Sequence, residues 1–299
     1  MIRYGWDRGA GLNQSRRRNR KSQQRVSVTE RVMNKTKARW HSPFAGPLQV
    51  FENFILRICK GFLLTNMKNK PIAIIGGMGP EASAYLYSAL INNAVKQFHA
   101  VNNEDFPQIV LYSVPVPDFI SSSTKEKEAL EILKQKVLEL NKLNVLCGAI
   151  ACNTAHIMLQ DLQSISNFPF VSIVDEVVTQ IEKDNIKKVG LLGTPSTLNS
   201  SIYQKALEKK EVNVIVPDEK EFPIIEQAIR NVISESSTGE DMNNLKRIAD
   251  ILKSEGAEAI VLACTELPLV FPIEYSLPVY NSVEILSLAL LERYYSRKT

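Results

Sequence analysis

The fold is indicated by two short stretches of this sequence, AIACNTAH at residues 149–156 and VLACTEL at residues 261–267. In each stretch an apolar run ends in a cysteine, and polar residues follow at once. An apolar strand that turns into a helix places the residue at the turn on the carboxyl edge of a sheet, where open α/β folds bind ligands. Cys152 and Cys264 are therefore predicted to occupy equivalent positions in the fold.

A second pair of similar stretches suggests that the chain is duplicated. AIIGG at residues 73–77 is echoed by GLLGT at residues 190–194, so Gly76 pairs with Gly193 at a separation of 117 residues, and Cys152 pairs with Cys264 at 112. Two motifs that recur at nearly one separation favour two similar halves with one cysteine each. Chance matching of strand-turn-helix units, which tend to look alike, is the alternative. If the halves face each other, the two thiols share one cleft.

Apolar runs alternate with amphipathic stretches from Pro71 to the C-terminus, which is the pattern of βα units. The expected strands are 71–75, 108–114, 147–151, 170–173, 188–192, 213–216 and 259–263, and a short segment at 277–280 precedes the final helix. The expected helices are 80–98, 125–143, 154–162, 175–183, 195–209, 219–233, 239–255 and 283–294. Short loops between such units predict parallel, buried sheets. We therefore predict an α/β fold of two similar doubly wound domains related by pseudo-duplication, with the active site in the cleft between them.

The first 70 residues differ in charge from the rest of the chain. They hold 16 Lys and Arg and three acidic residues, whereas the remaining 229 residues hold 20 basic and 29 acidic residues. The net charge of +4 for the whole chain therefore does not indicate a nucleic-acid surface on the folded part. Residues 1–66 lack helical or strand periodicity, and we expect a basic, disordered extension; a transit peptide or a nucleic-acid-binding arm are the alternatives. The apolar stretch 50–64 is too short and too charged to cross a membrane.

The four cysteines of the chain do not have the spacing of a disulfide framework, which favours a reducing cytoplasm. Cys147 falls inside an apolar strand and is predicted to be an inert core residue. Cys152 and Cys264 instead stand at helix starts, where free N–H groups and the helix dipole lower the pKa of a thiol. We expect this position to favour the thiolate form of each.

Polar residues beside the two cysteines could hold a substrate. Asn153, Thr154 and Thr265 supply amide and hydroxyl donors suited to a carboxylate, and Glu266 could bind an ammonium group. His156 lies four residues after Cys152 on the same helical face; a role beside the thiol, a metal site and a solvated helix histidine are all open. Because no further Cys or His cluster supports a metal, none is predicted.

The stretch GMGPEA at residues 77–82 matches the dinucleotide fingerprint only formally, because no acidic residue follows the second strand at the required spacing. A turn whose backbone N–H groups approach a smaller anion is the better interpretation, with Gly77 and Met78 as binding residues. A purely structural tight turn is the alternative.

Two opposed thiols beside an anion pocket can remove a proton from one face of a carbon and return one to the other face. One group acts as base while the other, still protonated, acts as acid. No glycine loop fits a nucleotide, and no lysine is placed recognisably for a pyridoxal Schiff base, so we predict a small-molecule racemase without a cofactor.

These motifs resemble the aspartate/glutamate racemase family, specifically its aspartate racemase branch. The matching stretches, in order, are IIGGMGP at 74–80, CNTAH at 152–156, LLGT at 191–194, ST at 196–197 and ACTE at 263–266. The resemblance implies cofactor-independent amino-acid racemisation with Cys152 and Cys264 as the acid/base pair, substrate contacts from the motif residues including Thr197, and a homodimer. It also implies a first domain of residues 67–172 joined by a final helix within 280–299, and a second domain of residues 173–279.

One position departs from the family pattern. Aspartate-specific relatives tend to carry Pro-Asp-Arg in the loop after the second strand, where the arginine binds the side-chain carboxylate; this chain has Phe119 after Pro117-Asp118. A second basic residue, which the resemblance implies near positions 230–234, is not clearly aligned, and Arg230 is the candidate for it. The resemblance therefore leaves the amino acid open. A hydantoin racemase, a maleate isomerase that attacks carbon covalently, and a catalytically degenerate small-carboxylate binding protein are the alternatives.

Overall fold

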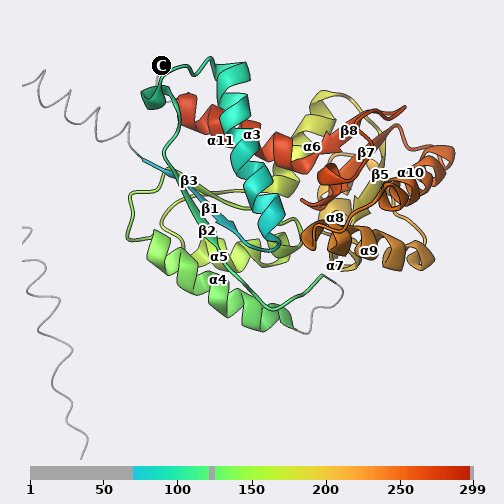
Figure 1. Ribbon diagram of the computed structural model, residues 1–299, viewed down its shortest axis with the longest axis horizontal. Helices are drawn as coiled ribbons and strands as arrows, with labels where there is room; N and C mark the ends of the chain where they lie inside the picture. Colours follow the sequence, from blue (N-terminus) through green and yellow to red (C-terminus); the bar gives the residue numbers. More distant parts are fainter. Residues whose placement is uncertain (1–69, 121–124, 297–299) are drawn as a thin grey trace, which may run out of the picture. The chain divides into compact units, whose positions relative to one another are not determined.

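Each half of the chain forms a four-stranded parallel sheet (Figure 1). The computed structural model describes residues 70–120 and 125–296, all within one compact unit of the chain, so the extension expected at residues 1–66 lies outside the described residues. The first sheet has the order β2-β1-β3-β4 and consists of β1 (Ile72–Gly76), β2 (Ile109–Ser113), β3 (Cys147–Ile150) and β4 (Phe170–Val171). The second has the order β6-β5-β7-β8 and consists of β5 (Lys188–Gly193), β6 (Asn213–Ile215), β7 (Ala259–Ala263) and β8 (Val279–Asn281).

The two sheets have the same topology. In each, the first strand in chain order pairs with the second and the third, and the fourth pairs with the third. Gly76 and Gly193 end the equivalent strands β1 and β5, while Cys152 and Cys264 follow the equivalent strands β3 and β7. Shared strand order supports duplication over chance matching, and the predicted α/β fold with two similar parallel sheets is confirmed.

Helices cover both faces of the first sheet. Side chains of β1 alternate between two clusters: Ile72 and Ile74 pack with α3 (Pro80–Phe98) and α11 (Ser282–Tyr295), whereas Ala73 and Ile75 pack with α4 (Glu126–Leu140) and α5 (Leu159–Ile165). Because both faces are covered, every residue of β1 is buried, as expected for a parallel strand. Figure 1 shows α3 and α11 on one side of this sheet and α4 and α5 on the other.

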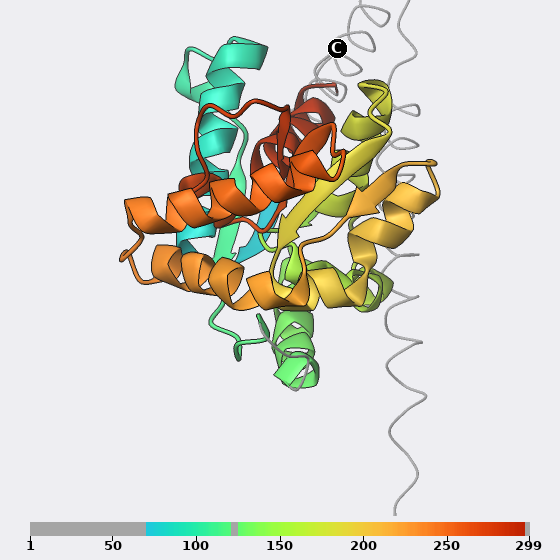
Figure 2. The ribbon, with the colours of Figure 1, turned by 90° about the vertical axis from the view of Figure 1, so that its right-hand side faces the viewer.

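The second sheet is covered in the same way, and one core links it to the first. Val189 and Leu191 of β5 pack with α6 (Ile173–Lys183) and α8 (Ile202–Glu208), while Leu192 packs with α9 (Phe222–Ile233) and α10 (Gly239–Ser254). The cluster that holds Val189 and Leu191 also contains residues of β1, α3 and α11. The final helix α11 packs against α3 and α6. Figure 1 labels these three helices, and Figure 2 shows the same ribbon turned by 90°. The domain boundary near residue 172 stays a prediction.

Several expected helices are interrupted. The helix expected at residues 195–209 is divided into α7 (Pro195–Ser200) and α8, because Ser201 between them has a left-handed φ of 58°, which an α-helix excludes. The helix expected after Cys152 begins as a 3-10 turn, η3 (Thr154–Met158), before α5, and the residues after Cys264 form only η5 (Leu267–Leu269). Two further 3-10 turns are η1 (Asn103–Asp105) and η4 (Glu219–Glu221). Neither cysteine therefore stands directly at the start of a long helix.

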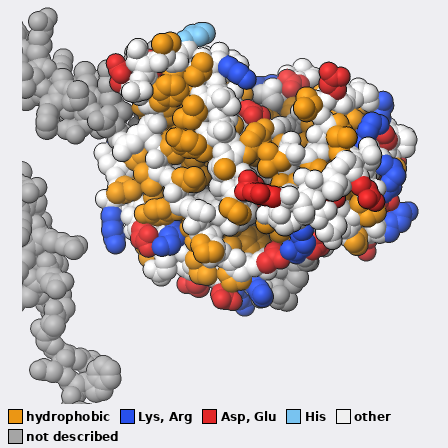
Figure 3. Space-filling model, in the orientation of Figure 1, with side chains coloured by type: hydrophobic (Ala, Val, Ile, Leu, Met, Phe, Trp, Pro, Cys, Tyr) orange, Lys and Arg blue, Asp and Glu red, His pale blue; other side chains and the backbone are white. Residues whose placement is uncertain are grey.

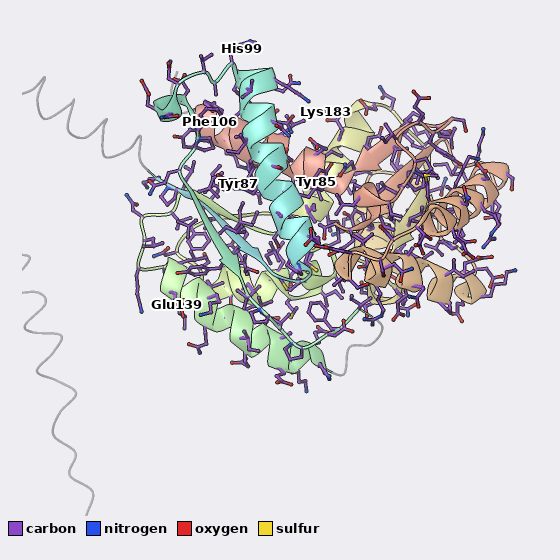
Figure 4. All side chains as sticks on the ribbon, in the orientation of Figure 1. Tyr85, Tyr87, His99, Phe106, Glu139 and Lys183 are labelled. Atoms are coloured by element: carbon purple, nitrogen blue, oxygen red, sulfur yellow. The ribbon has the colours of Figure 1, made fainter. Side chains whose placement is uncertain are left out.

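Helix α3 has one face in the core and an apolar face in solvent. Leu86 and Leu90 are buried, whereas Tyr87 and Val95 are 46% and 47% exposed; Figure 3 shows hydrophobic side chains along this part of the surface. Tyr85, marked with Tyr87 on α3 in Figure 4, donates its hydroxyl to Glu284 Oε1 at the first turn of α11. Although α3 is 19 residues long, no helix in the described part of the chain is apolar enough to cross a bilayer.

Candidate active site

Both predicted catalytic cysteines line one cavity of about 270 Å³ at the carboxyl ends of the two sheets. Its walls come from the turn after β1, the loop after β2, the residues that follow β3, β5 and β7, and helix α9. A cavity near the lower limit of the usual range for small-molecule sites suits one small metabolite. The lining residues are Gly77, Met78, Gly79, Pro80, Val116, Pro117, Asp118, Phe119, Ile120, Cys152, Asn153, Thr154, Thr194, Ile229, Arg230, Ile233, Cys264, Thr265 and Glu266.

Thr197 is the one predicted site residue outside this lining. It is fully buried, and its hydroxyl lies 2.9 Å from the hydroxyls of both Thr154 and Thr194. Thr197 thus holds the hydroxyl of Thr154 without reaching the cavity, and Thr194 lines the cavity instead of Thr197. Thr194 follows Gly193 at the end of β5, as Gly77 follows Gly76 at the end of β1, and that equivalence was the sequence signal for its position.

Cys152 is buried among hydrogen-bond donors. The backbone N–H groups of Thr154 and Ala155 and the hydroxyl of Thr154 interact with its sulfur and favour the thiolate. Burial outweighs them and, together with the nearby charge of Glu266, raises the pKa of the Cys152 thiol to about 12. The prediction that a helix start lowers this pKa is therefore wrong, because the donors belong to a short 3-10 turn and burial of the thiol outweighs them.

Cys264 is buried beside an acceptor rather than beside donors alone. Its Sγ donates to Glu266 Oε2 at 3.0 Å. Burial and then the charge of Glu266 raise the pKa of the Cys264 thiol well above its ordinary value, and the Cys152 sulfur adds to this effect. The predicted lowering of the thiol pKa is therefore wrong for Cys264 as well, and the two cysteines have unlike surroundings.

Glu266 joins the glycine turn after β1 to the second cysteine. Its Oε1 accepts from the N–H of Gly79 at 3.0 Å, and its Oε2 accepts from Thr265 Oγ1 at 3.0 Å as well as from Cys264. Burial raises the pKa of this carboxyl above its ordinary value, while the three hydrogen bonds oppose the shift. Glu266 is therefore a buried group that can hold either a charge or a proton next to the Cys264 sulfur.

In the glycine turn after β1, backbone N–H groups donate to side chains of the protein itself. The N–H of Gly77 donates to Ser83 Oγ at 2.8 Å, and that of Gly79 donates to Glu266. Gly77 has a φ of +91°, and a Cβ there would lie 2.3 Å from the backbone nitrogen of Val114, so only glycine fits. The N–H of Gly77, predicted to bind an anion together with Met78, is already bonded within the chain, so the structural interpretation of the turn holds for Gly77.

His156 is buried and hydrogen-bonded through both ring nitrogens, which excludes the alternative of a solvated histidine. Nε2 accepts from the N–H of Ile173 at 3.0 Å, which leaves the proton on Nδ1, and Nδ1 donates to the carbonyl of Cys152 at 2.8 Å. Burial lowers the pKa of His156 to about 4. His156 therefore positions the backbone of Cys152 and is neither a base for its sulfur nor a metal ligand; no three metal-binding side chains cluster within residues 70–120 and 125–296.

The lowered pKa of His156 predicts a measurable loss of stability in acid. The unfolded chain takes up a proton at this histidine near pH 6.5 and the folded chain near pH 4, so the free energy of unfolding falls as the pH drops through this window. We expect His156 to account for about 2–3 kcal/mol of that loss between pH 7 and pH 4. Urea unfolding of wild type and His156→Gln at both pH values measures it; equal losses in the two proteins would contradict the assignment.

Two other predicted residues have structural partners. Cys147 lies within β3, is buried and is not part of the cavity wall, as expected for a core residue. Asn153 lines the cavity, but its side chain donates to Ser282 Oγ at the start of α11 and accepts from the Tyr203 hydroxyl of α8. Its amide is thus used to anchor the segment that carries Cys152.

A match to a protein-family model identifies the family of the chain. The Asp/Glu/hydantoin racemase family model matches residues 75–289, a range that contains both cysteines and all the strands that position them except the first residues of β1. The chain belongs to this family. It is thereby an isomerase of the amino-acid racemase type.

Individual relatives agree with the family assignment. The chain is 29% identical over 227 residues to a broad-specificity amino-acid racemase, RacX, of Bacillus subtilis (strain 168), covering 75% of this chain and 97% of that protein. A crystal structure of an aspartate racemase homologue from Pyrococcus horikoshii OT3 matches with 31% identity and a TM-score of 0.64, over 75% of this chain and 99% of that one. An aspartate racemase from Picrophilus torridus matches with 26% identity and a TM-score of 0.66, over 77% of this chain and 98% of that one.

Proposed function

We propose that this racemase-family enzyme inverts the α-carbon of an amino acid without a cofactor, using Cys152 and Cys264 as acid and base on opposite faces. The supporting observation is that two thiols from equivalent strand ends of two matching sheets line one cavity of about 270 Å³. Racemisation needs a proton acceptor on one side of the reacting carbon and a proton donor on the opposite side. Two like groups on two like halves meet that need in both directions of the reaction.

The raised thiol pKa values require a third group, and Glu266 fits that role. We assign the resting protons to the Cys152 and Cys264 thiols and the negative charge to Glu266, because the Cys264 Sγ donates to Glu266 Oε2 and burial raises the pKa of both thiols. Moving that proton to Glu266 leaves Cys264 as a thiolate that can accept the α-hydrogen, while the Cys152 thiol donates to the other face. After inversion Cys152 is the thiolate, Cys264 the thiol and Glu266 still the acid, which is the starting state for the opposite enantiomer.

This scheme conserves protons and charge throughout. Two protons and one negative charge are shared by three buried groups, so no proton has to come from or go to water during one inversion. Between turnovers in the same direction, Cys152 takes up a proton from water and the Cys264–Glu266 pair releases one. The N–H groups of Thr154 and Ala155 would stabilise the thiolate when it is on Cys152, and the N–H of Glu266 when it is on Cys264. Glu266 is therefore proposed to hold a proton rather than to bind the substrate ammonium.

Substrate contacts are proposed for the cavity residues beside the thiols, Met78, Thr154, Thr194 and Thr265. The homodimer implied by the family resemblance and a reducing, cytoplasmic location, inferred from the cysteine spacing, also remain proposals. The broad-specificity racemase of Bacillus subtilis and the aspartate racemase of Picrophilus torridus both support amino-acid racemisation as the reaction.

The test is exchange and inversion at the α-carbon without added cofactor. Protein dialysed against a chelator and treated with hydroxylamine is expected to convert an amino acid from one enantiomer to the other, and to incorporate deuterium at the α-carbon in D₂O. A panel of amino acids analysed by chiral chromatography and mass spectrometry measures both. Activity that appears only after zinc or pyridoxal phosphate is added would contradict the mechanism. If the enzyme isomerises maleate or inverts a hydantoin but turns over no amino acid, the proposed amino-acid substrate is wrong.

A further inference from the structure

One wall of the cavity is apolar. It is formed by the loop after β2 and the last turns of α9, which contribute Val116, Phe119, Ile120, Ile229 and Ile233. Phe119 and Ile229 are buried and belong to the hydrophobic clusters on the outer faces of the two sheets. Burying an apolar substrate group against such a wall favours binding, whereas burying an unpaired carboxylate there opposes binding because the carboxylate loses its hydration.

The loop that carries Phe119 is held in place by the second half of the chain. Ser196 at the start of α7 donates its hydroxyl to the carbonyl of Phe119 at 2.7 Å and its N–H to the carbonyl of Ile120 at 3.1 Å. Phe119 is therefore fixed in the cavity wall before a substrate binds, so the apolar surface is a preformed part of the site.

The cation in this wall is already engaged. Among the cavity-lining residues in the described part of the chain, Arg230 alone is basic. Its Nη2 lies 2.8 Å from Asp118 Oδ2 and its Nε lies 2.8 Å from Glu226 Oε1, so one guanidinium is shared by two carboxylates. A substrate carboxylate would have to compete with both of them, in a group of three side chains whose net charge is negative.

We infer, on the basis of the racemase function proposed above, that this enzyme selects amino acids with apolar side chains and disfavours aspartate and glutamate. The substrate side chain packs against Phe119 and the two isoleucines of α9. The side-chain carboxylate of aspartate or glutamate would find no available counter-ion, because Arg230 is already paired with Asp118 and Glu226. The small cavity limits the side chain to a moderate size, such as that of leucine or methionine.

The wild-type enzyme tests this inference without any mutation. We expect kcat/KM for α-hydrogen exchange in D₂O to be at least about tenfold higher for leucine and methionine than for aspartate and glutamate, which is the order of discrimination that an apolar pocket provides. A preference for aspartate or glutamate would overturn the inference and leave the racemase proposal intact. If none of the amino acids tested exchanges its α-hydrogen, the proposed function itself is wrong.

Two variants test the residues assigned to selectivity. Asp118→Asn keeps an oxygen to accept the N–H of Ile120 but removes one charge from Arg230, and Asp118 is half exposed, so the protein should fold. The ratio of aspartate to methionine turnover is expected to rise about tenfold, because a guanidinium that keeps only the carboxylate of Glu226 can also pair with the substrate. Glu274→Gln, on the surface and outside the cavity lining, is the matched control and should leave the ratio unchanged. An unchanged ratio in Asp118→Asn would contradict the role given to the ion group.

Phe119→Arg restores the residue type of aspartate-specific relatives, and Phe119→Leu keeps the wall apolar. The first is expected to raise the aspartate-to-methionine ratio and the second to preserve the wild-type preference. Circular dichroism identifies a variant that fails to fold, in which case the wild-type panel and Asp118→Asn decide the inference.

Discussion

Cys152→Ser and Cys264→Ser are each expected to lower racemisation by about 10²–10⁴-fold, because a serine hydroxyl is too weak an acid and too rarely ionised to replace a thiol. Each variant retains one thiol, which can still remove the α-hydrogen from the enantiomer that presents it to that face. The two variants should therefore catalyse α-deuterium exchange with opposite enantiomers. Mass spectrometry of D- and L-substrate after incubation in D₂O measures this asymmetry.

Cys147→Ser is the matched control for these two variants. Cys147 is buried in β3 and lies outside the cavity lining, so a polar replacement is expected to cost stability on the order of 1 kcal/mol and to spare turnover. Full racemisation by either the Cys152 or the Cys264 variant would exclude the two-base mechanism. Exchange of the same enantiomer in both variants would exclude the assignment of one thiol to each face.

Glu266→Gln is expected to lower kcat/KM by about 10²-fold at pH 7, because the variant has no group to take the Cys264 proton. A thiolate then forms only by losing a proton to water, against a thiol pKa that burial has raised. The activity of the variant should rise about tenfold per pH unit above pH 7, in proportion to the thiolate fraction. Wild-type activity should change much less over the same range, since its proton moves within the site.

A pH profile separates this role from a structural one. If Glu266 only fixed the glycine turn through Gly79, the variant would lose activity by the same factor at every pH. Glu274→Gln is again the surface control, and it should follow the wild-type profile. A Glu266→Gln enzyme with wild-type activity at pH 7 would contradict the proton-holding role.

The sequence predicted the positions of the two cysteines because these depend on local patterns. Apolar strands that end at Cys152 and at Cys264 place the thiols on the carboxyl edges of the sheets whatever the details of packing, and the Gly76–Gly193 match revealed the equivalent halves. Helix α3 likewise begins and ends at the predicted residues, since Pro80 opens it and the apolar periodicity runs unbroken to Phe98.

The ionisation of the site could not be predicted in the same way. The pKa of each thiol depends on burial by segments far away in the sequence and on Glu266, whose orientation is set by Gly79, 187 residues away. The two hydrogen bonds of His156 also depend on tertiary structure, because one of its partners, Ile173, lies in the next βα unit. The break at Ser201 results from a left-handed backbone at a residue type that sequence patterns do not associate with such a turn.

The central claim, two thiols acting on opposite faces, is tested most directly by the isotope content of the first product formed by the wild-type enzyme. L-methionine or L-leucine is incubated in D₂O, and both enantiomers are separated and weighed by mass spectrometry while less than about a tenth has reacted. The two-base account predicts that nearly all D-product carries deuterium at the α-carbon, since its hydrogen comes from a second, solvent-exchanged thiol, while the remaining L-substrate is still protiated. D-product that retains the original hydrogen would show that one group removes and returns the same proton, and would contradict the account.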